Sequence, residues 1–188
     1  MKTLKTIAIA LLVTVSGAIF AQTKKIDAKT STVSWVGKKV TGQHSGTLAV
    51  KDGALVFKNA KLAGGTINVD MTTIAVTDLK AGEGKEDLEG HLKADDFFGT
   101  AKFPTAKIVF KTIANKSVGI YTVTADLTIK GISNPITFDL STTSNSATSS
   151  LKVDRTKYDI KYGSGSFFQN LGDKTISDEF ELNVVLKF

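Results

Sequence analysis

Apolar and polar residues alternate with a period of two through most of the chain beyond residue 32. The run at 66–76, for example, is predicted to place Ile67, Val69, Met71 and Thr73 on one face. Successive side chains of a β-strand point to opposite faces of a sheet, so each such run predicts a strand with one apolar face. Eight or nine runs joined by short polar or glycine-containing segments predict an all-β fold, either an antiparallel up-and-down barrel or a sandwich.

Turn residues suggest where the strands end. Lys51-Asp52-Gly53 stands between two apolar runs, and an Asp-Gly pair in that position predicts a tight hairpin. Asn134-Pro135 is predicted to form another turn. The Ser/Thr-rich stretch 141–150 is expected to be a flexible hairpin, followed by a strand from about Ser149 to Ile160.

One segment, residues 78–100, breaks the alternation and is rich in helix-forming residues. Leu88, His91 and Leu92 have the i, i+3, i+4 spacing of one helix face, which predicts a short helix ending near Phe98-Gly99. A long crossover of this kind in a barrel is expected to lie over one end and to act as a lid.

The N-terminus has the pattern of a secretory signal peptide. Basic Lys2 and Lys5 precede an apolar run from Ile7 to Val15, and small residues then lead to a predicted cleavage site after Ala21. A membrane anchor is the alternative, but the small residues favour cleavage. We therefore expect a signal peptide at 1–21, one domain at 22–188, and a periplasmic or secreted protein without a lipoprotein cysteine.

Composition argues against several classes of function. The formal net charge of +6 is modest and its lysines are scattered among acids, so nucleic-acid binding is not expected. The chain has no cysteine, which excludes disulfides and thiolate metal sites. Its two histidines, His44 and His91, are far apart, and no phosphate loop or nucleophile motif accompanies them. We expect no catalytic residue, no metal and no cofactor.

The apolar faces define a candidate interior. Eight strands make a barrel that is either filled by side chains or encloses one ligand, and the alternation alone leaves both open. Charged and aromatic polar residues near the apolar register could meet a ligand head group at the barrel mouth, and three residues of the crossover could form the lid. The predicted interior is Val33, Trp35, Leu48, Phe57, Ile67, Val69, Met71, Ile108, Phe110, Tyr121, Val123, Leu127, Phe138, Phe180 and Leu182, the mouth Lys39, His44, Arg155 and Tyr158, and the lid His91, Phe97 and Phe98.

The run from Gly90 to Ala106, with His91-Leu92, Asp95-Asp96-Phe97 and Phe103-Pro104, resembles the signature of the YceI-like family. Further motifs of the same family occur in the expected order on both sides of this run, at 31–35, 69–74, 127–136, 154–160 and 178–182. The resemblance implies an extended, eight-stranded, antiparallel lipocalin-like barrel with a short helical crossover. It also implies export, frequent dimerisation, polyisoprenoid lipids bound in the barrel, and no established catalytic residue.

Three functional hypotheses follow. The first is an exported carrier or storage protein for a polyisoprenoid or similar long-chain lipid, with transient membrane contact and a homodimer as further expectations. The second is a secreted enzyme acting on a lipid or small acyl compound, with His44 or His91 as base. The third is an interaction module whose barrel is filled.

Overall fold

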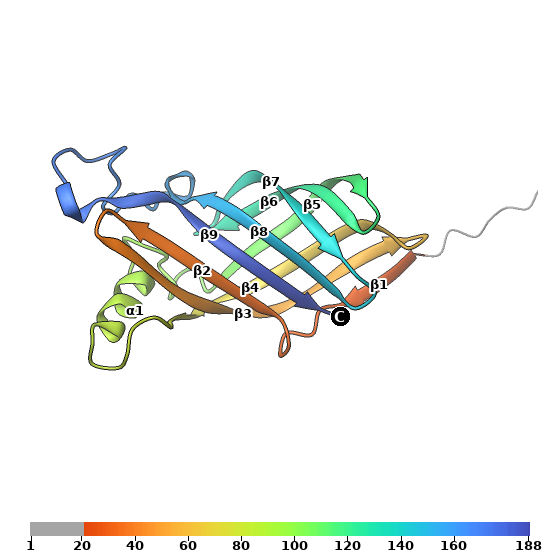
Figure 1. Ribbon diagram of the computed structural model, residues 1–188, viewed down its shortest axis with the longest axis horizontal. Coiled ribbons are helices and arrows are strands. Elements are labelled where there is room, and N and C mark those ends of the chain that lie inside the picture. Colours follow the sequence, from red (N-terminus) through yellow and green to blue (C-terminus); the bar gives the residue numbers. More distant parts are fainter. Residues whose placement is uncertain (1–20) are drawn as a thin grey trace, which may run out of the picture.

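The structure is a computed structural model, and it describes residues 21–188 (Figure 1). The predicted signal peptide lies outside the described residues, except for its last residue, Ala21. The strands are β1 Ala21–Lys25, β2 Thr32–Lys39, β3 Gly42–Lys58, β4 Lys61–Val76, β5 Thr105–Ser117, β6 Ile120–Ile129, β7 Ile132–Thr142, β8 Ser146–Asp154 and β9 Ile176–Lys187, and the helices are α1 Lys85–Lys93 and the 3₁₀ turns η1 Arg155–Tyr158 and η2 Gly172–Lys174.

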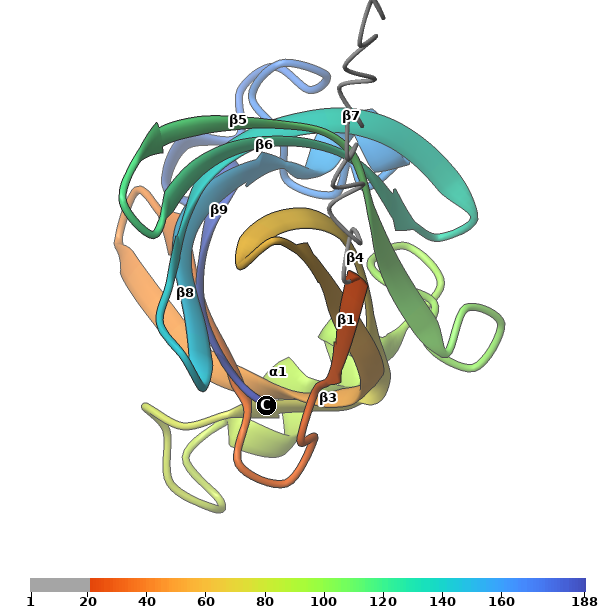
Figure 2. The same cartoon turned by 90° about the vertical axis from the view of Figure 1, so that its right-hand side faces the viewer.

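Eight strands close an antiparallel barrel, as predicted. The order around the wall is β3-β2-β9-β8-β7-β6-β5-β4, and β4 returns to β3. The short β1 pairs with the second half of β3, on the edge that β2 occupies along the first half. Viewed along the barrel, the strands curve around a common axis with α1 at the far end (Figure 2). α1 and the 155–175 segment occupy one end of the barrel, which we call the lid end. The other end, the hairpin end, holds β1, the C-terminus and three tight turns (Figure 1).

The prediction of a hairpin at Asp52-Gly53 is wrong, because β3 continues through these two residues. Here the register of β3 against β4 shifts between Val50 and Asp52, which is a β-bulge. Because of the extra residue, the inward-facing positions have even numbers before the bulge, as at Val50, and odd numbers after it, as at Leu55 and Phe57. A side chain at Gly53 would lie 2.6 Å from the carbonyl oxygen of Thr66, so this glycine permits a close approach of strands.

A second bulge corrects the face predicted for Thr73. The register between β3 and β4 shifts between Thr47 and Ala49, so burial in β4 passes from Met71 to Ile74. Thr73 is exposed, and its hydroxyl accepts a hydrogen bond from the Ala49 N–H at 2.9 Å. The alternation is therefore interrupted where the two longest strands bend around the barrel.

Two other predicted boundaries also differ from the structure. The β6–β7 turn is formed by Lys130 and Gly131, which have positive φ angles of 51° and 75°, whereas Asn134-Pro135 lies within β7. β8 ends at Asp154 and does not continue to Ile160.

The β7–β8 junction is a seam in the barrel wall. Within residues 21–188, these strands pair directly at only two positions, Ser141–Thr148 and Thr142–Ala147. Beyond them, the Ser149 hydroxyl donates to the Asp139 carbonyl at 2.7 Å. At the lid end, the Asn134 amide donates to the Lys157 carbonyl at 2.8 Å. The β8–β9 ladder, in contrast, continues from Ser146–Lys187 to Asp154–Glu179.

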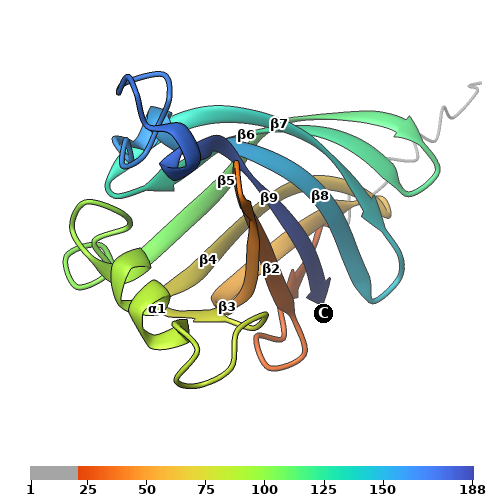
Figure 3. The same ribbon diagram turned by 60° about the vertical axis from the view of Figure 1, so that its left-hand side comes forward.

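The crossover between β4 and β5 covers the lid end (Figure 3). α1 buries Leu92, and its Glu89 carboxylate accepts a hydrogen bond from the Val76 N–H at 2.9 Å. At the start of the crossover, Asp78 accepts hydrogen bonds from the Ser45 N–H at 2.9 Å and contacts His44 Nδ1 at 2.9 Å. The predicted helical crossover is therefore present, although the helix ends at Lys93, before Phe98. No helix among the described residues is long and apolar enough to span a membrane.

Candidate functional site

Two adjoining cavities lie within the barrel. The cavity nearer the lid end has about 810 Å³ of empty space and the other about 620 Å³, both including some volume open to solvent. Five lining residues are shared by the two cavities, which therefore lie against each other; these are Val33, Val69, Ala106, Leu127 and Leu182.

The lining agrees closely with the predicted interior. Every predicted interior residue lines one or both cavities except Phe57, Tyr121 and Val123. Those three are buried in the apolar cluster towards the hairpin end, together with Leu62 and Leu140. Side chains thus pack the hairpin end of the barrel, and the two cavities lie in its middle and at its lid end.

The predicted lid aromatics form part of the cavity wall. Phe97 and Phe98 both line the lid-end cavity and are buried. Their ring centroids are 5.2 Å apart in an edge-on arrangement, and Phe98 lies 6.3 Å from the ring of Phe180 on β9. His91 does not line either cavity. Its ring is 5.5 Å from Phe97 and 4.4 Å from Tyr162, so it packs beside the cavity lining, and a lid role for these residues stays a prediction.

Arg155, predicted at the mouth, lines the lid-end cavity but is almost fully buried, with 2% of its surface exposed. Its Nε donates to the Ser177 carbonyl at 2.9 Å, Nη1 to the Ile160 carbonyl at 2.8 Å, and Nη2 to the Ile176 carbonyl at 3.1 Å. Burial lowers the pKa of Arg155, while the charges of Asp178 and Asp154 oppose that effect. The side chain therefore joins η1 to β9, and a head-group contact by Arg155 stays a prediction.

Tyr158, also predicted at the mouth, is buried in the apolar cluster that contains Phe97 and Ile160, and it does not line a cavity. Burial and the negative charge of Asp154 raise the pKa of Tyr158 to about 12. Among the described residues, no group accepts a hydrogen bond from its hydroxyl.

Asp178 lies on β9, opposite Arg155, with 3.6 Å between its Oδ1 and Nη2 of the arginine. Burial raises the pKa of Asp178, but the hydroxyls of Ser164 and Ser166 and the charge of Arg155 outweigh it and leave the pKa below its usual value. The Ser166 hydroxyl donates to its other oxygen at 2.5 Å. Arg155 and Asp178 thus attach the 155–175 segment to the barrel wall.

Lys39 and His44 lie on the outside of the lid end, at the β2–β3 hairpin and early in β3, and neither lines a cavity. His44 is held by Asp78 on the barrel exterior. The four predicted mouth residues are therefore not brought together in one site. Within residues 21–188, no group of three or more metal-ligating side chains is suitably placed for a metal ion.

The sequence prediction missed several lining residues. Leu151, Val184 and Leu186 continue the alternation of β8 and β9 and could have been included on that basis. Ile74 could not, because the bulge in β4 changes its face. Leu92 lines the cavity from α1, where strand periodicity carries no information.

Comparison with known proteins agrees with this architecture. A family model described as a YceI-like domain matches residues 25–188. A UPF0312 protein of Shewanella denitrificans is 38% identical over 86 residues, covering 46% of this chain and 42% of that protein. Another, from Pseudomonas fluorescens, is 30% identical over 141 residues, covering 73% of this chain and 70% of that protein. The chain spans less than half the length of the first of these relatives.

Solved structures share the fold. Burkholderia cenocepacia BcnA has a TM-score of 0.65 at 22% identity, covering 87% of this chain and 99% of that one. A polyisoprenoid binding domain from Saccharophagus degradans has a TM-score of 0.59 at 15% identity, covering 87% and 95%. The family match extends over both the barrel strands and the crossover that lines the cavity. This chain therefore belongs to the YceI-like family.

Proposed function

We propose that this protein binds a long apolar lipid of the polyisoprenoid class inside its barrel and carries it through an aqueous compartment after export. The observation that carries the proposal is the pair of adjoining apolar cavities inside the barrel. Its lining is aliphatic and aromatic except at a few positions, such as Arg155, Ser177 and Glu179 near the lid end and Ser149 near the seam.

The shape of the space favours a chain over a compact ligand. On β9 the lining extends from Ile176 to Leu186. At a rise of about 3.3 Å per residue, this is about 33 Å along the strand. A strand tilt of about 40° reduces it to about 25 Å along the barrel axis. That length is similar to the bilayer hydrocarbon core, which is about 30 Å thick.

Such an interior would keep the free-energy change of lipid transfer from membrane to protein small. Each methylene group removed from water gains about 0.8 kcal/mol, so a long isoprenoid tail does not cross water alone at a useful rate. Inside the barrel, Val69, Leu127, Leu182 and their neighbours would replace the surrounding acyl chains. One apolar environment then exchanges for another with little net change in free energy.

The choice of a polyisoprenoid is supported by the fold shared with the Saccharophagus degradans domain, which is described as polyisoprenoid binding. Export rests on the pattern of Lys2, Lys5 and the apolar run before Ala21. A homodimer, expected from the family resemblance, stays a prediction.

The enzyme hypothesis required His44 or His91 as a base. His44 pairs with Asp78 outside the barrel and His91 packs between Phe97 and Tyr162, so neither ring borders the cavity. We infer a binding protein and not an enzyme. Loss of cellular activity on replacing both histidines, with lipid binding unchanged, would argue for the enzyme.

The test is to extract the protein, purified from its own cell, with organic solvent and to analyse the extract by mass spectrometry. The protein after lipid removal is then titrated with a long polyprenol. We expect about one lipid per chain in both measurements. The absence of lipid in the extract, together with no binding of the polyprenol, would refute the proposal and favour the interaction module.

A matched pair of variants tests where the chain lies. Ala106 is buried and lines both cavities, whereas Ala63 on β4 is exposed. Ala106→Phe should fill the junction between the cavities and reduce polyprenol affinity at least tenfold. Ala63→Phe should leave it unchanged. Equal affinities of the two variants would place the lipid elsewhere.

A further inference from the structure

The loop between η1 and β9 exposes three aromatic side chains. Tyr162, Phe167 and Phe168 are 48%, 52% and 50% exposed. Every other aromatic side chain in residues 21–188 is buried or half-buried. Exposed large aromatic groups gathered in one segment are characteristic of a surface that contacts an apolar partner.

These side chains are held outward by an ordered backbone. Ser164 is completely buried, and its carbonyl accepts hydrogen bonds from the N–H groups of Phe167 and Phe168 at 3.2 and 2.9 Å. The Ile176 N–H donates to the Gly163 carbonyl at 2.8 Å. The Ser166 hydroxyl donates to Asp178 at 2.5 Å. Backbone and side-chain hydrogen bonds thus hold the loop in place while about half of each phenylalanine remains exposed to water.

The neighbouring β2–β3 hairpin adds to the same surface. Its tip residue, Val40, is 67% exposed, and the Val40 N–H donates to the Thr175 carbonyl at the base of the loop, at 3.1 Å. The exposed apolar groups therefore come from two segments joined by a backbone hydrogen bond, at the lid end of the barrel (Figures 1 and 3).

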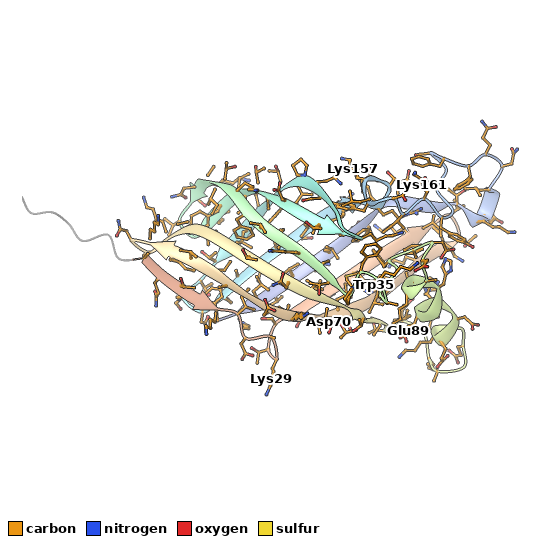
Figure 4. All side chains as sticks on the ribbon, turned by 180° about the vertical axis from the view of Figure 1, so that it is seen from behind. Lys29, Trp35, Asp70, Glu89, Lys157 and Lys161 are labelled. Atoms are coloured by element: carbon orange, nitrogen blue, oxygen red, sulfur yellow. The ribbon has the colours of Figure 1, made fainter. Side chains whose placement is uncertain are left out.

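Basic residues surround this apolar surface. Excluding the buried Arg155, the segments 38–41 and 156–175 together carry five basic and two acidic side chains. Lys157 and Lys161 lie near the base of the loop (Figure 4), and the Lys161 ammonium is 5.1 Å from the ring centroid of Phe167. Asp159, one of the two acids, is paired with Lys161 at 2.7 Å. Aromatic rings bordered by lysines are suited to the interface between water and an anionic bilayer.

The loop is also continuous with the cavity. Ile176 and Ser177, which follow it directly, line the lid-end cavity, and their carbonyls are held by Arg155. A partner that binds the loop would therefore lie at the lid end of the barrel, next to the crossover and to the polar part of the cavity lining.

We propose that the 161–175 loop, with the β2–β3 hairpin beside it, docks the protein on a bilayer containing anionic lipids by inserting Phe167 and Phe168 among the head groups. Docking would bring the lid end of the cavity to the membrane, and in this sense the inference rests on the proposed function. The surface itself is defined by exposure and charge, so it can be tested independently of lipid uptake.

The experiment is co-sedimentation of the purified protein with vesicles of phosphatidylcholine, with and without phosphatidylglycerol. We expect binding to the anionic vesicles that weakens with added salt. Phe167→Ser combined with Phe168→Ser should weaken it at least tenfold. Val118→Ser is the control, because Val118 is fully exposed in the β5–β6 turn at the opposite end. Lys157→Gln combined with Lys174→Gln should reduce binding to anionic vesicles.

Several results would overturn the proposal. These are no sedimentation with either vesicle, equal binding by the wild-type and double-serine proteins, or a dimer in solution that the double-serine substitution abolishes. In the last case the loop would bind a second copy of the chain. Polyprenol titration of the same double variant separates the two proposals. Retained polyprenol binding with lost sedimentation supports docking, and sedimentation without polyprenol binding by either protein would refute only the proposed lipid site.

Discussion

The hydroxyl of Tyr121 on β6 accepts a hydrogen bond from the backbone N–H of Leu62 on β4 at 3.2 Å. β4 pairs with β5 only from Thr66 onward, so the Leu62 N–H has no strand partner on that side. Tyr121 is buried and reaches across from the next strand but one. At the hairpin end, a side-chain hydroxyl thus accepts the backbone hydrogen bond that a neighbouring strand accepts elsewhere in the wall.

Tyr121→Phe should therefore leave a buried N–H unsatisfied and lower the free energy of unfolding by about 1–3 kcal/mol. Urea denaturation monitored by circular dichroism would measure the change. Tyr162→Phe, at an exposed ring, is the matched control and should change stability by less than about 0.5 kcal/mol. An unchanged free energy of unfolding in Tyr121→Phe would mean that the Leu62 N–H finds another acceptor.

Arg155→Met should destabilise the protein by about 3–5 kcal/mol, because it removes the donor to one buried and two partly buried carbonyls and the positive charge beside Asp178. Arg155→Lys should recover only part of the loss, since one ammonium cannot reproduce the planar guanidinium contacts. Lys157→Met is the control at an exposed position. Thermal unfolding of the four proteins would show this order. Equal melting temperatures for Arg155→Met and the wild type would contradict the anchoring role.

The raised pKa of Tyr158 predicts a loss of stability in alkali. Its pKa is 10.0 ordinarily and about 12 in the folded protein. The unfolded chain therefore releases this proton first, and stability falls between pH 10 and pH 12. Below pH 10 the contribution is complete. The loss should reach about 2 kcal/mol at pH 12, where the folded protein is itself half ionised at this residue, since each pKa unit corresponds to about 1.4 kcal/mol.

Tyr158→Phe should remove that part of the alkaline decline and, at pH 7, should preserve stability because the hydroxyl has no partner among the described residues. Urea titrations of both proteins at pH 7, 10 and 11.5 provide the comparison, in which the titration of the lysines cancels. Parallel pH profiles for the two proteins would refute the assignment.

Asp78 predicts an effect of acid on the crossover. Burial raises the pKa of Asp78, but hydrogen bonds from the Ser45 N–H and His44 outweigh it, and the pKa is below the ordinary 3.8. Its contribution to stability is present above pH 3.8 and is lost as the pH falls through the lower folded value. Asp78→Asn should therefore increase the hydrogen exchange of the backbone amides of residues 77–84 at pH 6. In this variant the protection of these amides should also change less as the pH is lowered. Unchanged exchange at pH 6 would mean that other contacts hold the crossover.

The seam predicts an alternating pattern of amide exchange in β7. With Lys130 and Gly131 as a two-residue turn, the paired amides of β7 that face β6 include those of Ile136 and Phe138. The amide of Thr137 faces β8, where the ladder is absent in the described residues. Native-state exchange followed by NMR should show Thr137 exchanging much faster than its two neighbours. Equal protection of all three would mean that the seam is closed in solution.

Much of the barrel could be predicted from the sequence because alternation reports burial directly. Val33, Val69, Leu127 and Leu182 were assigned to the interior on this basis, and all four border both cavities. Whether the interior is hollow could not be predicted in the same way. A filled and an empty barrel bury the same face of each strand, and the difference depends on strand tilt and on how far the side chains reach.

The errors have local physical causes. Asp52-Gly53 is equally suited to a turn and to a bulge, and the pairing of β3 with β1 and β4 on its two edges decides in favour of the bulge. Pro135 indicated a turn because proline has no N–H. In the structure its nitrogen lies on the seam side of β7, so no ladder bond is lost. Arg155 was assigned to the mouth by its charge, but its partners are carbonyls distant in the sequence.

The incomplete β7–β8 ladder gives the barrel unequal stiffness around its circumference. From β2 through β9 to β8 the wall is held by long ladders, whereas from β7 to β8 it depends on two residue pairs and on the hydrogen bonds at Ser149 and Asn134. If the barrel widens, the β7–β8 junction is the place where the fewest hydrogen bonds between strands would have to break. We therefore expect the width of the interior to vary mainly at this seam, which under the proposed function would allow lipid chains of different bulk to bind without a change of fold.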